Sequence, residues 1–206
     1  MKWLPRIKTI VYAKGQVCPP VQPHTRVVEV PESLLQGLSS QKSPQGVIFT
    51  CDMPTEQIPE IGPGMLLLDG IQDPGNLGTI LRTADALDIP VVLLEGCADP
   101  CSHKVVRASM GAVFRRDVLR SDWKTVKTAC AAAGIRVGVT ALSDRAKDLR
   151  QSDLKSMAVV IGSEGQGVRQ EILDSADAEL IIPMNPHCES LNAAVAATIV
   201  MWQMKQ

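Results

Sequence analysis

The sequence predicts an α/β protein, with a mostly parallel sheet and helices on both of its faces. Short apolar runs and helical segments alternate from residue 65 to the C-terminus, and this alternation is typical of parallel sheets. The first run, Met65–Asp69, is apolar up to its final acid, as expected of a strand that is buried on both faces. Apolar residues make up 45% of the 206-residue chain, so the chain can bury a core of this kind.

The first part of the chain has few periodic segments. It contains a β-like run at Arg26–Val30, a helix candidate at Pro31–Leu38 and a second β-like run at Gly46–Cys51. The segment from Ile58 to Gly64 is dense in proline and glycine, which is typical of a linker. The expected division is a first piece at 1–58, a linker at 59–64 and a main domain at 65–206.

Strand and helix patterns follow one another in the main domain. The segment Asp122–Ala133 is the clearest helix, because Ser121 or Asp122 can cap its start and Gly134 can end it. The other helices are expected at 77–87, 104–110 and 190–205. Strands are expected at 65–69, 90–94, 113–119, 135–140, 158–162 and 179–183.

Composition excludes several classes of protein. No run approaches about 18 apolar residues, so no membrane span is expected. The N-terminus has no apolar run behind its basic residues, so no secretory signal is expected and the predicted location is cytoplasmic. The six cysteines form no CxxC pair and the three histidines form no cluster, which predicts reduced thiols and no metal site.

The net charge of −1 argues mildly against a nucleic-acid partner, but the charge is uneven. Residues 1–50 hold six Lys or Arg against two Glu, and residues 101–127 hold seven against two Asp. Such segments suit either phosphate contacts or an ordinary solvated face, and charge alone does not choose between them.

A first polar motif follows the strand at residue 65. Asn76 is placed to cap a helix that starts at Leu77. Gly78 and Arg82 are four residues apart, so they share a helix face, and Arg82 is expected over the space that Gly78 leaves, near the helix N-terminus. An arginine there would suit an RNA phosphate. Taken alone, a plain cap and a solvated arginine are the favoured interpretation.

A second motif follows the strand expected at 158–162. Gly162, Gly165 and Gly167 stand within six residues, and such a loop lets its backbone approach a ligand closely. No Gly-Lys-Ser/Thr follows and the spacing is not GxGxxG, so neither a P-loop nor a dinucleotide fingerprint is present. Glu164 suits anchoring of a cationic or amide-bearing group. The alternative is a tight turn between a strand and a helix.

A third motif runs from Ile181 to Ala194. Ser190 is placed to cap the last helix, and alanines at 193, 194, 196 and 197 permit close packing within the fold or between subunits.

Together the motifs resemble those of the SpoU (TrmH-like) branch of the SPOUT methyltransferases. The shared patterns are Asn-x-Gly-x-x-x-Arg, Gly-x-Glu-Gly-x-Gly and Ile-Pro-Met followed by Ser-Leu-Asn, in the same order. The resemblance covers roughly Met65 to Gln206. It implies a C-terminal trefoil knot formed by the second and third motifs, S-adenosylmethionine bound in that knot, and a homodimer whose active sites lie between subunits.

The resemblance also assigns residues to roles. The implied cofactor-binding residues are Thr140, Ala141, Leu142, Gly162, Gly167, Ile182 and Leu191. The implied catalytic residues are Arg82, Asn76, Glu164, Ser190 and Asn192.

The implied reaction is methyl transfer to a ribose 2′-hydroxyl of structured RNA. Arg82, with a substrate phosphate, would promote deprotonation of the hydroxyl, either as the base or as an electrostatic stabiliser. The first piece resembles the end of a small RNA-binding domain, which favours ribosomal over transfer RNA. No opening strands or helix of that domain are expected in Met1–Thr25, so the piece is interpreted as truncated or diverged. Two alternatives stay open. The protein could be a knotted RNA-binding protein without turnover or a nicotinamide-dependent oxidoreductase, and the missing GxGxxG disfavours the second.

Overall fold

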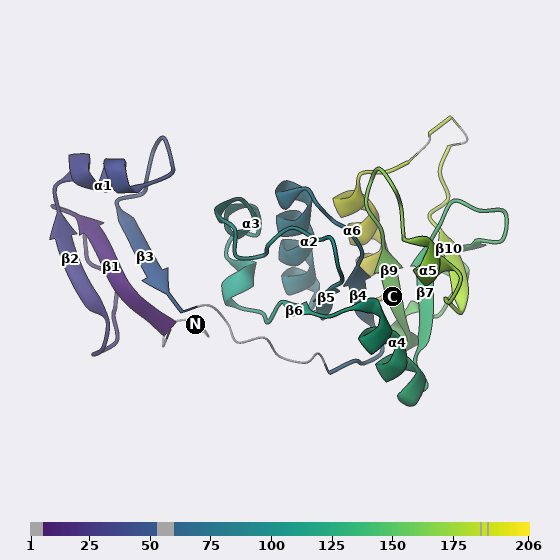
Figure 1. Cartoon of the computed structure of the whole chain (residues 1–206). Helices are drawn as coiled ribbons and strands as arrows, with labels where there is room; N and C mark the ends of the chain where they lie inside the picture. Colours follow the sequence, from purple (N-terminus) through teal and green to yellow (C-terminus); the bar gives the residue numbers. More distant parts are fainter. Residues whose placement is uncertain (1–5, 53–59, 186, 189) are drawn as a thin grey trace. The chain divides into compact units, whose positions relative to one another are not determined.

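The computed structural model describes residues 6–52, 60–185, 187–188 and 190–206. The chain forms two compact units, Met1–Thr55 and Glu56–Gln206, and each is described by itself (Figure 1). Pro59, the first residue of the expected linker, lies outside the described residues.

The first unit is a three-stranded sheet with one helix. Strand β1 (Ile7–Ala13) lies in the middle, parallel to β2 (Arg26–Val30) and antiparallel to β3 (Val47–Cys51). Helix α1 (Glu32–Leu38) buries Leu35 in a small cluster with residues of β1 and β2. The expectation of no strand before Thr25 was wrong. Lys8 and Thr9 interrupt the apolar pattern of β1, so the sequence of this strand gives a weak signal.

The second unit holds a seven-stranded sheet in which every pairing is parallel, which confirms the predicted fold class. The strand order is β6-β5-β4-β9-β7-β10-β8. The strands are β4 (Met65–Leu68), β5 (Val91–Leu93), β6 (Leu119–Arg120), β7 (Arg136–Thr140), β8 (Lys147–Asp148), β9 (Met157–Ile161) and β10 (Ala178–Ile181).

Helices cover both faces of this sheet (Figure 1). They are α2 (Pro74–Leu87), α3 (His103–Ala108), α4 (Trp123–Ala132), α5 (Gln170–Leu173) and α6 (Ala193–Gln203), with short 3₁₀ turns at η2 (Ala112–Phe114), η3 (Leu149–Gln151) and η4 (Leu154–Ser156). Successive side chains of a strand point to opposite faces. Leu66 and Leu68 therefore pack with residues of α2, α3 and α6, whereas Met65 and Leu67 pack with residues of α4 and α5.

The strand expected at 113–119 was wrong. Gly111 has a φ of 80° and begins the 3₁₀ turn η2, and only Leu119 and Arg120 join the sheet, as β6. The helix expected at 104–110 ends at Ala108, and Met110 lies beyond it with a φ of 49°. Charged residues at 115–117 interrupt the apolar run, which explains why a longer edge strand does not form there.

The order of the strands places the loops that carry the motifs. From β4 the chain builds one side of the sheet with β5 and β6, and then crosses to the other side, where it forms β7 and β8. Strand β9 then lies between β4 and β7, and β10 lies between β7 and β8. Ligands in such sheets bind at the carboxyl ends of the strands where the order reverses, which here is the pair β4 and β9. The trefoil knot stays a prediction from the family resemblance. Within the described part of the chain, no helix is long and apolar enough to cross a membrane.

Candidate active site

The first motif lies between β4 and α2. Helix α2 begins earlier than expected, because Asp73 is its cap and accepts a hydrogen bond from the Asn76 backbone N–H at 2.7 Å. Pro74 follows at the first helical position, where a missing N–H costs nothing. Asn76 therefore lies inside the first turn and is not the cap. Its side-chain amide is left for other partners.

Gly78 allows α2 and α3 to touch. A Cβ at this position would lie 2.4 Å from the Ala108 Cβ and 2.9 Å from the Ser109 backbone nitrogen. The space beside Gly78 is thus filled by α3, and the expectation that Arg82 covers it was wrong. The Arg82 side chain is exposed, and among the described residues it has no hydrogen-bond or ion-pair partner. Its positive charge is therefore open to an anion from outside.

The second motif doubles back on itself. Ser163 and Gly167 exchange two backbone hydrogen bonds, of 3.1 and 2.9 Å. Gly167 has a φ of 68°, and a Cβ on Gly162 would lie 2.1 Å from the Gly167 carbonyl carbon. The turn is closed tightly against its own first residue, which leaves Glu164 exposed at its tip.

Hydrogen bonds join one residue from each motif. The Asn76 side-chain Nδ2 donates to Glu164 Oε1. The Asn192 Nδ2 donates to Asn76 Oδ1 at 3.0 Å. Asn192 also caps α6, since its Oδ1 accepts from the backbone N–H groups of Ala194 and Val195. The structure thus brings together three of the five expected catalytic residues.

Two expected catalytic residues stand apart from these hydrogen bonds. Ser190 is exposed and precedes the helix by two residues, so the expectation that it caps α6 was wrong. Asn192 takes that role. Arg82 lies on α2, on which Asn76 also lies, but makes no contact with the bonded group.

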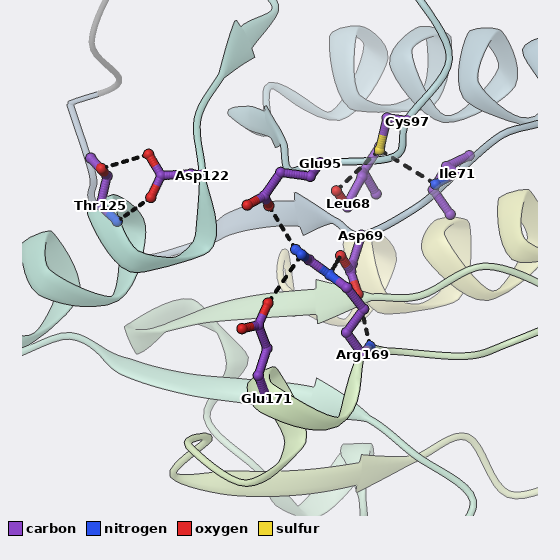
Figure 2. Close-up of polar contacts among 9 residues, drawn as sticks. All are labelled: Leu68, Asp69, Ile71, Glu95, Cys97, Asp122, Thr125, Arg169 and Glu171. Atoms are coloured by element: carbon purple, nitrogen blue, oxygen red, sulfur yellow. Dashed lines mark hydrogen bonds and ion pairs between the residues drawn. The ribbon is translucent and has the colours of Figure 1, made fainter.

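A second polar group, which the sequence did not reveal, lies beside the motifs (Figure 2). Asp69, directly after β4, is 1% exposed. It accepts from the Arg169 backbone N–H at 2.8 Å and from Arg169 Nε at 2.7 Å. The same guanidinium reaches Glu95 at 2.7 Å and Glu171 at 3.0 Å. We call these four residues the Arg169 cluster. Asp69 and Arg169 are separated by 100 positions, so only the fold pairs them.

The charges of the cluster shift one another's pKa. Partial burial acts to raise the pKa of Glu95, but hydrogen bonds from Arg169 and from backbone outweigh it, and the pKa lies below its usual range. Burial acts to lower the pKa of Arg169, but hydrogen bonds to Glu95 and Asp69 raise it above its usual value. Both groups therefore keep their charges.

Cys97 forms hydrogen bonds with the backbone at the start of the loop after β4. Its thiol donates to the Leu68 carbonyl at 3.2 Å and accepts from the Ile71 N–H at 3.4 Å (Figure 2). Burial raises the pKa of this thiol, so it stays protonated at neutral pH and keeps its donor.

The residues expected to bind the cofactor follow three neighbouring strands. Thr140 is the last residue of β7, Ala141 and Leu142 follow it, Gly162 follows β9, and Ile182 follows β10. Two hydrogen bonds tie these ends together: Thr140 Oγ1 donates to the Val160 carbonyl at 3.2 Å, and the Ala141 N–H to the Leu180 carbonyl at 3.0 Å.

This edge fits an adenosine group. Leu142 is 64% exposed, and Ile182 and Leu191 are half-buried, so apolar side chains remain available to a purine ring. Gly167 has its place in the turn, against Gly162. Within the described ranges, no group of three or more His, Cys, Asp or Glu side chains could hold a metal ion.

Comparisons with known proteins show the family of the chain. The SpoU rRNA Methylase family matches residues 63–202. The 23S rRNA (guanosine(2553)-2′-O)-methyltransferase RlmP of Bacillus subtilis is 35% identical over 175 residues, which cover 84% of this chain and 70% of that protein. A TrmH-family tRNA/rRNA methyltransferase of Staphylococcus aureus is 39% identical over 145 residues, but the chain covers only 57% of its length.

Solved structures give the same result. The AdoMet-bound rRNA methyltransferase of Sinorhizobium meliloti is 32% identical with a TM-score of 0.81, covering 97% of this chain and 80% of that one. The SpoU methyltransferase AviRb of Streptomyces viridochromogenes, in complex with AdoMet, is 25% identical with a TM-score of 0.81, covering 96% and 81%. The chain therefore belongs to the SpoU rRNA methylase family of S-adenosylmethionine-dependent RNA methyltransferases.

Proposed function

We propose that the protein transfers the methyl group of S-adenosylmethionine to a ribose 2′-hydroxyl of ribosomal RNA. The observation that carries this proposal is the hydrogen-bonded group Asn192–Asn76–Glu164, which joins the three motifs on the helix that carries the free Arg82 guanidinium. The Bacillus subtilis relative, which matches over most of this chain, is named for 2′-O-methylation of 23S rRNA. This favours ribosomal over transfer RNA.

In the proposed mechanism, the chain's own residues hold and orient the reactants. The residues after β7, β9 and β10 and Leu191 hold the cofactor, which supplies an activated methyl group on its sulfonium. Arg82 binds a phosphate next to the target ribose and stabilises the charge that grows on the 2′-oxygen. Glu164 and Asn192 hold the Asn76 amide in one orientation, and Ser190, two residues before Asn192 in the third motif, contacts the substrate.

In this proposal the two units have different roles, RNA binding and methyl transfer. Residues 1–58 supply an RNA-binding piece, which the surplus of basic residues in 1–50 supports. Residues 65–206 supply the knotted methyltransferase domain. The six cysteines all lie in the described part of the chain and none of them forms a disulfide, which suits the reducing cytoplasm, where we place the protein.

The test is the substitution Arg82→Ala, with Arg150→Ala as a matched control. Among the described residues, Arg150 forms its ion pair with nearby Asp148. We expect Arg82→Ala to lower methyl transfer to ribosomal RNA by about 100-fold or more, with cofactor affinity in calorimetry unchanged. Arg82→Lys should restore little, because an ammonium lacks the planar fork that holds a phosphate at two points. Parental transfer by the Arg82→Ala protein would overturn the assigned role.

The same assay decides between turnover and binding alone. A protein that binds S-adenosylmethionine but methylates no RNA would be a binding protein of this fold. Removing the gene from cells and mapping the lost 2′-O-methyl mark identifies the substrate. A lost mark in transfer RNA, or on a base, would contradict the proposed substrate.

We also propose a homodimer that forms through α6. Trp202 is 60% exposed and Val195 is 48% exposed, although the helix is almost wholly apolar. An apolar helix with exposed large side chains suits burial against a second copy. Light scattering at micromolar concentration should give twice the mass of the chain, and Trp202→Glu should give the mass of one copy. A monomeric mass of the parent protein would contradict this proposal.

A further inference from the structure

The glycine-rich turn of the second motif is attached to the first motif at two points. Near its tip, Glu164 accepts from Asn76. Beyond its end, Arg169 binds Asp69 through both its backbone N–H and its guanidinium. Asp69 begins the loop between β4 and α2, and Asn76 lies in the first turn of α2, just beyond that loop. In the loop between β9 and α5, Glu164 lies near the tip of the turn and Arg169 is the last residue before α5. The second attachment thus constrains the first.

The Arg169 guanidinium reaches three carboxylates from three segments (Figure 2). Asp69 directly follows β4, and Glu95 lies after β5. Glu171 lies in α5, the helix that begins directly after Arg169. Only a planar group with several donors can serve these directions at once. The buried Asp69 carboxylate in turn fixes the position of the guanidinium, because it accepts two hydrogen bonds at 2.7 and 2.8 Å.

The turn itself contributes little rigidity toward Glu164. Gly165 has no neighbour within 4 Å of a Cβ built on it, and glycine restricts its backbone least. The two hydrogen bonds between Ser163 and Gly167 close the turn but do not bind it to the loop after β4. That connection is made by Asn76 at one end and by the Arg169 cluster at the other. Each of the three guanidinium nitrogens of Arg169 is paired with a carboxylate, so we assign Arg169 no contact with the substrate.

We propose that Arg169 is a positioning residue for methyl transfer, which holds the glycine-rich turn on Asp69 so that Glu164 meets Asn76. The inference rests on the proposed active site. Arg169 acts through Glu164, so its effect on the rate depends on Glu164 being present. A residue that only stabilises the fold would affect the rate equally in either background.

The experiment is a kinetic double-mutant cycle with Arg169→Gln and Glu164→Ala, measured on the full chain. The substrate is total RNA from cells that lack the gene. Arg169→Gln should lower kcat by about 100-fold in the parent background, since a misplacement near 1 Å has this effect. In the Glu164→Ala background it should lower kcat by less than about threefold, because residues in one network are not additive. Equal factors in the two backgrounds would overturn the proposal, and so would parental kcat in Arg169→Gln.

Two further variants keep the test valid if Arg169→Gln does not fold. Arg169→Lys keeps a charge for the buried Asp69, and Glu95→Gln removes one exposed partner. Each should lower kcat by about tenfold, with the same loss of effect in the Glu164→Ala background. Arg150→Ala, an exposed ion-pair arginine outside the cluster, should leave kcat at the parental value.

The outcome separates this inference from the proposed function. Methylation in the assay at a site outside ribosomal RNA would refute the proposed substrate, and the cycle would still measure the coupling of Arg169 to Glu164. Methylation of ribosomal RNA with independent effects of the two substitutions would refute the positioning role alone.

Discussion

Replacing Gly162 by alanine should destabilise the second unit and abolish cofactor binding. The added Cβ would lie 2.1 Å from the Gly167 carbonyl carbon, 2.2 Å from the Val168 nitrogen and 2.3 Å from the Gly167 oxygen. Ordinary van der Waals contact begins at 3.4 Å. The backbone at Gly162 and the backbone at Gly167 and Val168 must therefore move apart by more than 1 Å. All three atoms belong to the backbone, so no side chain can rotate away.

The cost follows from what this separation breaks. Overpacking of this kind costs about 1–3 kcal/mol. Moving Gly167 also weakens its two hydrogen bonds with Ser163, each worth about 0.5–1.5 kcal/mol. The free energy of unfolding should therefore fall by about 2–6 kcal/mol, and the melting temperature by at least about 5 °C.

Gly165→Ala is the matched control. Gly165 lies in the same turn and has an ordinary φ, and nothing lies within 4 Å of its Cβ position. Its substitution should change the unfolding free energy by less than about 0.5 kcal/mol. Urea unfolding and calorimetry with S-adenosylmethionine measure both quantities. If Gly162→Ala unfolds at the same urea concentration as Gly165→Ala, the packing argument is wrong.

Three further predictions concern the same unit. The pKa of Glu95 is lowered in the folded state, so its ion pair stabilises above its ordinary pKa, near 4.3, and this contribution is lost as the pH falls through the lowered value. Urea unfolding should show Glu95→Gln less stable than the parent at pH 7, by less than about 1 kcal/mol for a half-exposed pair, and this difference should shrink as the pH is lowered from 7 toward 3; a difference that does not shrink would contradict this. Asp122→Ala removes the cap of α4, where Asp122 accepts from the N–H and hydroxyl of Thr125, and should lower the melting temperature by about 2–4 °C; no change would count against the cap. Iodoacetamide at neutral pH should label exposed Cys188 well before Cys97, because burial raises the pKa of Cys97; mass spectrometry that finds equal rates would refute the protonated thiol.

The sequence predicted those parts of the fold in which burial is strongest. Met65–Leu68 is buried on both faces, so its apolar run allowed few alternatives. Strand β1 was missed because its polar residues hide the alternation. The edge strand was expected at 113–119 but forms only at Leu119–Arg120, as β6, where two residues pair with β5. Edge strands receive less support from neighbours, and their length depends on tertiary contacts that the local sequence does not contain.

For the site, the positions of the motifs were predictable but not their contacts. Each motif follows a parallel strand, so convergence of Asn76, Glu164 and Asn192 at one edge was expected from the fold class. The residue that caps each helix was not predictable, because several residues that can act as caps stand close together before α2 and before α6. In the folded protein Asn192 is the cap of α6. Asn76 is not the cap of α2, and its side chain accepts a hydrogen bond from Asn192 instead. The local sequence around either residue does not indicate that Asp69 pairs with Arg169.

The hydrogen bonds that join the motifs all run in one direction. The N–H groups at the start of α6 donate to the Asn192 oxygen, the Asn192 nitrogen donates to Asn76, and the Asn76 nitrogen donates to Glu164. Each amide is thereby held in a single orientation, and bonds in such a chain polarise one another. A ligand group that displaced the Asn76 amide from Glu164 would remove the final acceptor and leave that amide held only by the Asn192 donor at its oxygen. The cap of α6 is thus joined to the Glu164 carboxylate through two intervening hydrogen bonds.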